Sequence, residues 1–265
     1  MRSSTHAWRR LIAAVVMVCA LGGWAAASAL ADNYVALGDS YSAGTGTRDY
    51  SIDSGCNRGP YAYPELIRRD RPNTTLTAFV ACSGAKTGDV INNQLSSLST
   101  STNIVTITIG GNDAGFSNVI TRCALPLVSC SSDVTNANNY IRNTLPGNLN
   151  NVYSGIRSRA PNARVIVLGY PRLFMGVDCN AGTFFSSDEM TRLNATADLL
   201  KTTIAGRAAA YGFTFKDAIP AFVGHAVCSS TEWLNGLSNP ISDSYHPNRD
   251  GHRLGYEALV RSVIG

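Results

Sequence analysis

Several apolar stretches of this chain stop at a turn of small residues. At each turn lies a residue whose side chain or backbone amide can contact a ligand. Tyr34–Leu37 stops at a glycine two residues before Ser40, and Asn103–Ile109 stops at a Gly-Gly pair before Asn112. Gly84 likewise follows a strand-like stretch. In α/β sheets, ligands bind beyond the carboxyl ends of the strands. We therefore expect Ser40, Gly84 and Asn112 to share one edge of a sheet.

Segments with helical periodicity separate these stretches, so that strand and helix alternate about five times. The longest helix is predicted to open with a capping box, Ser186-x-x-Glu189, and to end near Gly212. Arg164–Gly169 is an apolar run typical of a strand buried on both faces. The pattern predicts a three-layer α/β/α sandwich around a central, mainly parallel five-stranded sheet. Cys123–Ala137 is expected to be a polar loop.

The N-terminus has the features of a secretory signal peptide. Three arginines lie within the first ten residues, Leu11–Ala27 is mostly apolar, and Ala29-Leu30-Ala31 has the small-x-small form of a cleavage site. A membrane anchor is the alternative, but the apolar stretch is short and ends in a cleavage pattern. We predict cleavage after Ala31, a single domain over residues 32–265, secretion, and no stable membrane insertion.

The basic excess of the chain belongs mostly to this N-terminal segment. Three of the 22 Lys and Arg residues lie there and none of the 18 Asp and Glu residues, which leaves 19 basic against 18 acidic side chains. A nearly neutral domain gives no reason to expect nucleic acid or another strongly anionic partner. The absence of heptad repeats favours a monomer.

Six cysteines remain once Cys19 has left with the signal peptide. An even number in an exported protein predicts disulfides, although spacing alone leaves their pairing open. The alternative, a zinc site, is disfavoured because no Cys-x-x-Cys occurs and only Cys228 has a histidine, His225, three to five residues away. The six are Cys56, Cys82, Cys123, Cys130, Cys179 and Cys228.

A serine such as Ser40 is a useful nucleophile only when a base stands beside it. Taken alone, Gly38-Asp39-Ser40 is more typical of an ordinary turn or helix cap. Among the histidines, His225 and His252 are expected to be surface or packed residues. His246 lies in a loop before a helix, next to a proline, and is the best candidate for a general base.

The imidazole needs a partner that fixes its tautomer, and the chain offers two. Asp243 lies three residues before His246, and a backbone carbonyl near Ser244 is the alternative. Attack on an ester also creates an oxyanion. The backbone amides of Ser40 and Gly84 and the side-chain amide of Asn112 are suitable donors, although each has an ordinary structural interpretation when taken alone.

Together these segments resemble the blocks of the SGNH hydrolases, the Gly-Asp-Ser-Leu family of esterases and lipases. The blocks of this chain are Gly38-Asp39-Ser40-Tyr41-Ser42-Ala43-Gly44, Gly84, Gly110-Gly111-Asn112-Asp113 and Asp243-Ser244-Tyr245-His246-Pro247. Tyr41 stands where many members have leucine. The resemblance implies Ser40 as nucleophile, His246 as base, and Ser40, Gly84 and Asn112 as the oxyanion hole.

The six cysteines make the chain similar to the exported actinobacterial lipases and phospholipases of this family. That resemblance implies sequential pairing, Cys56–Cys82, Cys123–Cys130 and Cys179–Cys228. In some of those relatives a main-chain carbonyl replaces the acid, which leaves the role of Asp243 open. No cofactor and no metal are expected.

The predicted function is a secreted serine esterase or lipase that hydrolyses carboxylic esters of lipids, acylglycerols or phospholipids, through an acyl-enzyme. A carbohydrate O-acetyl esterase is the nearest alternative. A metallophosphoesterase is disfavoured because the three histidines of the mature chain are too few ligands. A non-catalytic surface-binding module is a further alternative. Five aromatic residues either line an apolar groove or belong to the core: Tyr41, Phe116, Phe174, Phe184 and Phe185.

Overall fold

A parallel five-stranded sheet with strand order β2-β1-β3-β4-β5 forms the centre of the structure. The computed structural model describes residues 31–125, 127–176 and 185–265. The strands are β1 (Asp32–Gly38), β2 (Thr74–Phe79), β3 (Ile104–Thr108), β4 (Arg164–Leu168) and β5 (Thr214–Lys216). The predicted fold class is confirmed.

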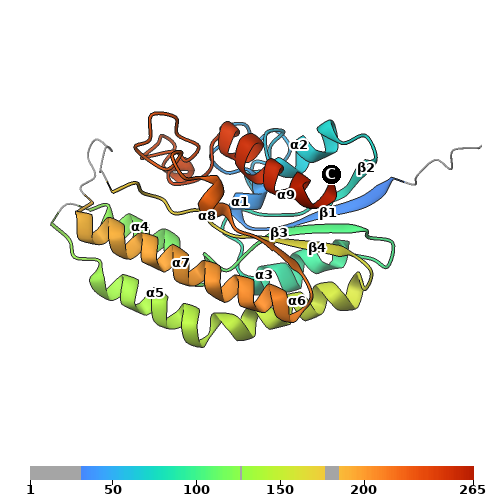
Figure 1. Ribbon diagram of the computed structural model, residues 1–265, viewed down its shortest axis with the longest axis horizontal. Coiled ribbons are helices and arrows are strands. Elements are labelled where there is room, and N and C mark those ends of the chain that lie inside the picture. Colours follow the sequence, from blue (N-terminus) through green and yellow to red (C-terminus); the bar gives the residue numbers. More distant parts are fainter. Residues whose placement is uncertain (1–30, 126, 177–184) are drawn as a thin grey trace, which may run out of the picture. The chain divides into compact units, whose positions relative to one another are not determined.

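Helices cover both faces of the sheet, and Figure 1 shows α2 and α9 on one side and α3 to α7 on the other. The α-helices are α1 (Ser40–Ala43), α2 (Tyr63–Asp70), α3 (Thr87–Asp89), α4 (Phe116–Cys123), α5 (Ser131–Asn143), α6 (Leu145–Arg159), α7 (Ser187–Ala210), α8 (Ala218–Ala221) and α9 (Ala258–Ile264). The other helical turns are η1 (Val90–Gln94), η2 (Leu95–Ser97), η3 (Ile241–Asp243) and η4 (Gly251–Glu257).

The central strands are buried on both faces, as their apolar composition predicts. Tyr34–Leu37 of β1 and Val165–Leu168 of β4 are at most 2% exposed. The threonines of β3 are buried as well, and they are satisfied by hydrogen bonds. Thr106 shares one with the Tyr34 hydroxyl over 2.7 Å, and the Thr108 hydroxyl donates one to Asp39 over 2.7 Å. Buried hydroxyls without such partners would cost stability.

The order of the strands places the end of β1 at a switch point. The chain leaves β1 for β2 on one side and then returns to β3 on the other side. Crevices for ligands form at such reversals of strand order. Gln94 also holds this point, since its side chain accepts a hydrogen bond from the Gly38 N–H over 2.7 Å and donates one to the Gly38 carbonyl over 2.9 Å.

One expectation about secondary structure was wrong. The segment Cys123–Ala137 was expected to be a polar loop, but α5 begins within it, at Ser131. Its buried residues, Val134, Ala137 and Ile141, form a helical stripe that packs against the core. The polar Ser and Asn residues around them conceal that stripe in the sequence. The capping box of Ser186 and Glu189 is present at the start of α7, as predicted.

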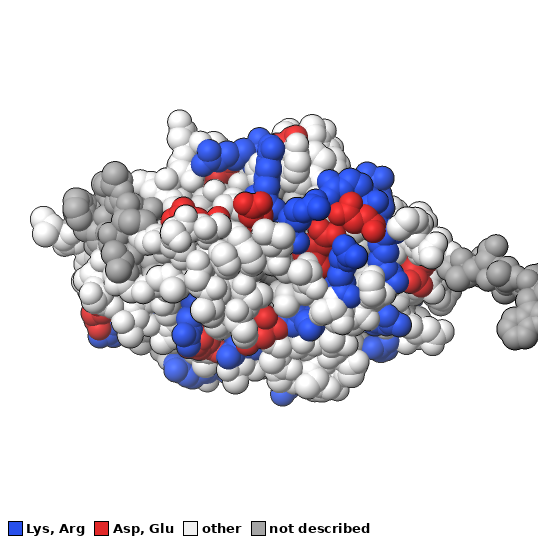
Figure 2. All heavy atoms as spheres, turned by 45° about the horizontal axis from the view of Figure 1, so that its top comes forward, with Lys and Arg blue, Asp and Glu red and all other residues white. Residues whose placement is uncertain are grey.

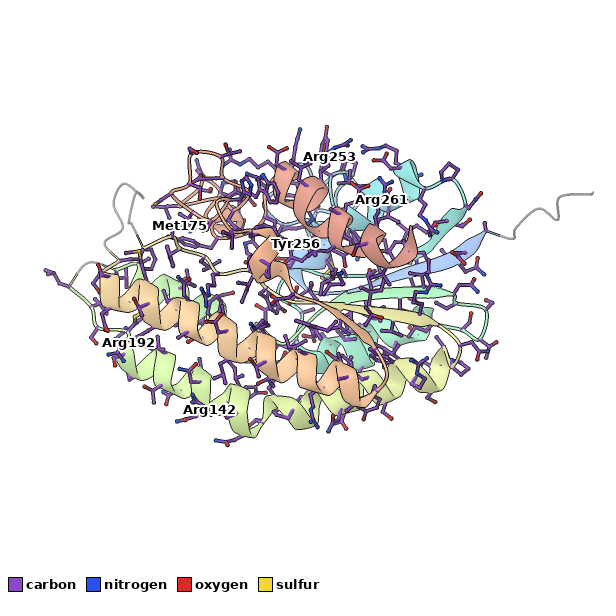
Figure 3. The ribbon with its side chains drawn as sticks, in the orientation of Figure 1. Arg142, Met175, Arg192, Arg253, Tyr256 and Arg261 are labelled. Carbon is purple, nitrogen blue, oxygen red and sulfur yellow. A yellow bond between two sulfur atoms is a disulfide. The ribbon has the colours of Figure 1, made fainter. Side chains whose placement is uncertain are left out.

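The C-terminal turns η4 and α9 contribute both core and surface. Tyr256 points inward in Figure 3, is fully buried, and donates a hydrogen bond to the Gly169 carbonyl over 2.9 Å. On the outside, Arg253 and Arg261 lie near Asp70 and Glu257. Figure 2 shows charged side chains gathered over α2 and this C-terminal region, whereas much of the remaining face is uncharged.

Two of the three expected disulfides, Cys56–Cys82 and Cys123–Cys130, are present. Cys179 lies outside the described residues, and so do the predicted signal peptide up to residue 30 and Phe184. None of the helices in the described part of the chain has the length and hydropathy needed to cross a membrane.

Candidate active site

Ser40 is the first residue of α1, directly after the end of β1. Asp39 is the helix N-cap, and its carboxylate accepts a hydrogen bond from the Tyr41 N–H. The turn requires glycine at Gly38, where φ is +125° and a Cβ atom would lie 2.5 Å from the carbonyl oxygen of Thr108. The chain therefore turns sharply at the sheet edge and raises the Ser40 side chain toward a cavity.

Asp39 itself belongs to a buried network of hydrogen bonds. Its carboxylate accepts hydrogen bonds from the hydroxyls of Thr108 and Tyr170, and Tyr170 accepts one from the Gly111 N–H over 3.2 Å. Burial raises the pKa of Asp39 to about 6, and its hydrogen bonds oppose that shift. The network joins the ends of β1, β3 and β4, which fixes the turn that carries Ser40.

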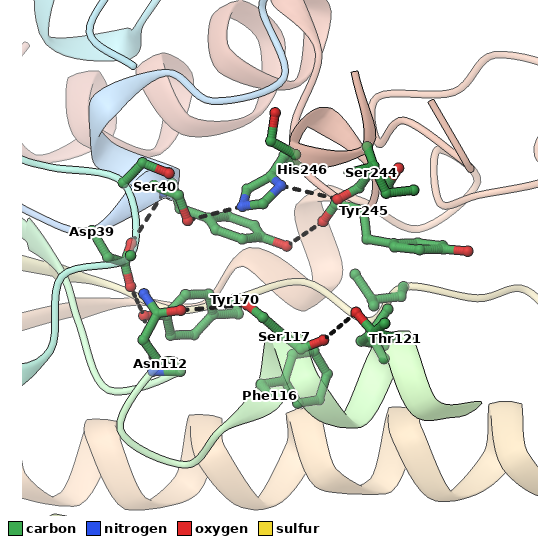
Figure 4. A pocket seen from close by; sticks show the side chains of 18 of the residues that line it. Asp39, Ser40, Asn112, Phe116, Ser117, Thr121, Tyr170, Ser244, Tyr245 and His246 are labelled. Atoms are coloured by element: carbon green, nitrogen blue, oxygen red, sulfur yellow. Dashed lines mark hydrogen bonds between the residues drawn. The ribbon is translucent and has the colours of Figure 1, made fainter. Parts of the chain in front are cut away.

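His246 meets Ser40 from a loop at the other end of the chain. Its Nε2 atom lies 2.9 Å from the Ser40 hydroxyl oxygen, and its Nδ1 atom lies 3.0 Å from the Ser244 carbonyl oxygen, as Figure 4 shows. A carbonyl only accepts hydrogen bonds, so Nδ1 carries the proton of the neutral ring and Nε2 is left to accept one from Ser40. Burial lowers the pKa of His246 to about 4.

Asp243 does not reach the imidazole by a hydrogen bond. Its side chain is fully buried, one carboxylate oxygen accepts a hydrogen bond from the Tyr50 hydroxyl, and the other has no partner among the described residues. The negative charge of Asp243 still opposes the lowering of the His246 pKa. Of the two partners that the sequence left open, the Ser244 carbonyl is the one in contact with the ring.

The loop that carries His246 is held by contacts with residues distant in the sequence. The hydroxyl of Tyr41 donates a hydrogen bond to the Tyr245 carbonyl over 2.7 Å. The Asn235 N–H donates one to the His246 carbonyl over 2.9 Å, and the Asn235 side chain donates to the Gly46 and Asp243 carbonyls. These hydrogen bonds hold the loop so that the imidazole lies within hydrogen-bonding distance of Ser40.

The other two histidines lie apart from this dyad. His225 stacks on Trp233 with 3.8 Å between ring centroids. His252 is buried between Tyr63 and Tyr256, and burial lowers its pKa to about 3. Both are packed residues, in agreement with the sequence analysis.

The three proposed oxyanion donors border the same cavity. Ser40 and Gly84 have backbone amides that donate to no other described residue, and Gly84 has φ of +82°. The Asn112 side-chain amide donates one hydrogen bond to the Ala85 carbonyl over 3.1 Å and accepts one from Ser117 over 3.4 Å. An amide NH₂ group has two donors, so the second remains for a ligand.

The loops of Gly84 and Asn112 are also tied to each other. Asp113, the residue after Asn112, accepts hydrogen bonds from the N–H and the hydroxyl of Thr87. The contact joins the third block of the sequence to the start of α3. It keeps two donors that come from different strands at a constant separation.

The cavity above Ser40 has a volume of about 530 Å³ and a largely aliphatic wall. The wall residues come mainly from α4, α7 and the loops after β4 and before His246, and include Phe116, Ile120, Leu173, Leu200 and Ile241. Tyr41 and Phe116 line it, as one interpretation of the aromatic residues predicted. Phe174 and Phe185 do not; they pack on each other with 4.7 Å between ring centroids and are at most 4% exposed.

Sequence reasoning missed the residues that hold the dyad rather than the dyad itself. Tyr170 follows the end of β4, so the rule that located Ser40 and Asn112 would have found it. The contacts of Tyr41 with Tyr245 and of Tyr50 with Asp243 left no signal in the sequence. The one cluster of metal-ligand type found among the described residues, Cys123, Cys130 and Glu189, contains a disulfide in place of free thiolates.

Comparison with known proteins finds close relatives of this chain. The model of the GDSL-like lipase/acylhydrolase family matches residues 36–254. Lipase 1 of Streptomyces coelicolor is 45% identical over 257 residues, which cover 96% of this chain and 94% of that protein.

Solved structures agree as well. The crystal structure of an extracellular lipase from Streptomyces rimosus superposes with a TM-score of 0.83 at 43% identity, and phospholipase A1 from Streptomyces albidoflavus NA297 superposes with 0.82 at 45%. Each comparison covers 88% of this chain and 99% of the other. The chain therefore belongs to the GDSL-like lipase/acylhydrolase family and is a carboxylic ester hydrolase.

Proposed function

We propose that this protein is a lipase or phospholipase that cleaves carboxylic esters through an acyl-enzyme on Ser40. The observation that carries the proposal is the chain of contacts from the Ser40 hydroxyl through both nitrogens of His246 to the Ser244 carbonyl. The Ser40 end of this chain of contacts borders an apolar cavity, and the proposed oxyanion donors of Ser40, Gly84 and Asn112 border the same cavity. The arrangement suits a serine nucleophile, its base, and an oxyanion hole.

In the first step Ser40 Oγ attacks the ester carbonyl while His246 Nε2 takes its proton. The carbonyl oxygen of the ester becomes an oxyanion, which accepts hydrogen bonds from the amides of Ser40 and Gly84 and from the Asn112 side chain. His246 then returns the proton to the leaving alcohol, and the acyl group remains on Ser40. In the second step water attacks the acyl-enzyme while His246 takes its proton, and His246 then returns that proton to Ser40 Oγ as the acid is released.

In this proposal the Ser244 carbonyl takes the position that a carboxylate holds in a Ser-His-Asp triad. It orients the ring and stabilises the charged imidazolium as a dipole, without a full negative charge. Asp243 acts at longer range and positions the loop through Tyr50.

The cavity wall supports a lipid as the substrate. An acyl chain transferred from water to an aliphatic surface gains about 0.8 kcal/mol per buried CH₂ group, whereas an acetyl group on a sugar would leave most of this wall unoccupied. A carbohydrate O-acetyl esterase remains the alternative. We further propose that residues 1–31 are removed on secretion and that the remaining domain acts as a monomer.

The test is hydrolysis of p-nitrophenyl esters from acetate to palmitate by the purified protein and its Ser40→Ala variant, with and without a chelator. We expect activity that resists the chelator, favours long chains and disappears in the variant. Equal activity of both proteins would refute the role of Ser40, and an optimum at acetate would favour the deacetylase. Mass spectrometry of the secreted protein should find Asp32 as the first residue.

A further inference from the structure

The aliphatic wall of the cavity continues onto the outer surface of the protein. Leu125, after α4, and Ile241, at the start of η3, both line the cavity and are 46% and 70% exposed. The two residues come from loops that are far apart in the sequence. Large aliphatic side chains therefore border the cavity entrance from two sides.

Leu127 lies two residues after Leu125 and has an unusual backbone conformation. Its side chain is fully exposed, and its backbone has φ of +62°, a region that residues other than glycine rarely adopt. The Cys123–Cys130 disulfide closes the loop in which it lies. A fully exposed leucine adds no buried apolar surface to the folded state, and its backbone conformation is unfavourable. Backbone outliers of this kind cluster at functional sites.

The two loops are also free of charge at the surface. Residues 123–130 contain no Lys, Arg, Asp or Glu, and residues 236–242 contain none either. The neighbouring Arg122 lies 3.6 Å from Asp133. Arg48 reaches the edge of this region through a hydrogen bond from its guanidinium to the Ser238 hydroxyl over 3.3 Å. We call Leu125, Leu127 and Ile241 the apolar rim.

We infer that the apolar rim docks the enzyme onto the surface of a lipid aggregate with zwitterionic or uncharged head groups. The inference rests on the proposed function, because a lipid ester must pass from its aggregate to Ser40. Rim residues that enter the aggregate let the acyl chain slide along a continuous aliphatic surface without crossing water. The continuity of rim and cavity favours this partner over a protein, which would have no need to reach the wall around Ser40.

Vesicle binding separates docking from chemistry. The Ser40→Ala protein is sedimented with phosphatidylcholine vesicles, alone and with Leu127→Gln or Ile241→Gln added, all with the same N-terminus as verified by mass spectrometry. We expect each added substitution to weaken binding about fivefold or more, from the burial of one aliphatic side chain. Leu254→Gln is the matched control, because Leu254 is 50% exposed but lies in η4, among charged neighbours such as Arg253.

Three results would overturn the inference. The first is equal binding by the rim variants and the Leu254→Gln protein. The second is binding that needs anionic phosphatidylglycerol and disappears in 0.5 M salt, which would mean electrostatic attraction through Arg48 and its neighbours. The third is a dimer that Leu127→Gln dissociates while vesicle binding stays unchanged, which would make the rim a contact between copies.

Soluble substrate separates this inference from the proposed function. With Ser40 intact, Leu127→Gln should leave the hydrolysis of dissolved p-nitrophenyl butyrate unchanged and reduce the hydrolysis of phosphatidylcholine vesicles by about the same factor as binding. Loss of both activities to the same extent would contradict the rim. Absence of any ester hydrolysis by the unsubstituted protein would refute the proposed function and leave the vesicle binding data to decide on the rim.

Discussion

The two halves of the Ser40–His246 pair are built in different ways. Ser40 follows a central strand, and the backbone around it belongs to the sheet, with the Asp39 N–H donating to the Thr108 carbonyl over 3.0 Å. His246 lies in a loop whose position depends on single side chains, above all Tyr41 and Asn235. Sheet pairing fixes Ser40, the proposed nucleophile, whereas contacts of single side chains fix His246, the proposed base. Substitutions on the two sides should therefore fail in different ways.

The largest effect is expected at the base. In His246→Ala no group remains to take the Ser40 proton, so kcat/KM for p-nitrophenyl butyrate should fall by at least about 10³-fold. The thermal midpoint should change little, because the ring is only partly buried and borders a cavity. A loss of less than tenfold would show that another group acts as the base.

The next effect concerns the sheet-edge side. Asn112→Ala removes one oxyanion donor and should lower kcat by about 10²–10³-fold with little change in KM. Asn112→Asp, which keeps the size but replaces the donor with a carboxylate, should be at least as impaired. A change confined to KM would mean that Asn112 binds the ground state only.

The pH profile of the unsubstituted protein tests the surroundings of His246. Burial lowers its pKa to about 4, so the neutral base persists as the pH falls and kcat/KM should hold down to well below pH 6.5. A histidine with an ordinary pKa would lose about 30-fold by pH 5. A midpoint of the acid limb at 6.5 or above would mean that the surroundings of the ring do not lower its pKa.

The lowered histidine pKa values also make the free energy of unfolding fall as the pH falls. His246 and His252 both have lowered folded-state pKa values, so the unfolded chain binds more protons from pH 6.5 down to about 4 for His246 and about 3 for His252. Their contribution to stability is present above pH 6.5 and is lost as the pH falls through that window. Circular dichroism at each pH separates this unfolding from the titration of the base.

A smaller effect is expected at Asp243. Asp243→Asn keeps an oxygen to accept the Tyr50 hydrogen bond, and the Ser244 carbonyl still orients the ring. Activity should fall less than about tenfold, against about 10⁴ for the loss of the acid from a Ser-His-Asp triad. The acid limb should move to lower pH, since the charge that opposes the lowering of the His246 pKa is gone. A 10³-fold loss would restore Asp243 as the orienting group.

The smallest effect sharpens the contrast between the halves. Tyr41→Phe removes the hydrogen bond to the Tyr245 carbonyl and nothing else from the packing. The His246 loop should loosen, with kcat lowered about threefold to tenfold and KM unchanged. Tyr153→Phe is the matched control, because its buried hydroxyl has no partner among the described residues. Equal results for both variants would deny Tyr41 a part in positioning the base.

The sequence predicted the sheet side better than the loop side, for a physical reason. The strands are continuous local patterns, and parallel strands end at a common edge. The sequence alone therefore predicts that Ser40, Gly84 and Asn112 lie at one edge of the sheet. The loop of His246 is fixed by contacts between residues about two hundred positions apart, such as Tyr41 and Tyr245. No local pattern encodes such a pair.

The same reasoning explains the one wrong prediction about secondary structure and the choices that the sequence left open. Polar residues around Val134, Ala137 and Ile141 conceal the helical stripe of α5. Phe174 and Phe185 were compatible with both core and cavity, because composition indicates that an aromatic residue is buried but not which residues it packs against. The choice between Asp243 and the Ser244 carbonyl turned on a backbone group, which every residue possesses.

Gln94 has a consequence for efforts to redesign this enzyme. The residue lies outside the cavity wall, yet it supplies one donor and one acceptor to Gly38, as a neighbouring peptide group would. Only asparagine and glutamine carry both functions in a planar amide, as the backbone does, and asparagine is shorter by one methylene. A mutant library aimed at a new substrate can vary the aliphatic wall freely but should leave position 94 unchanged, because there a side chain serves as part of the backbone.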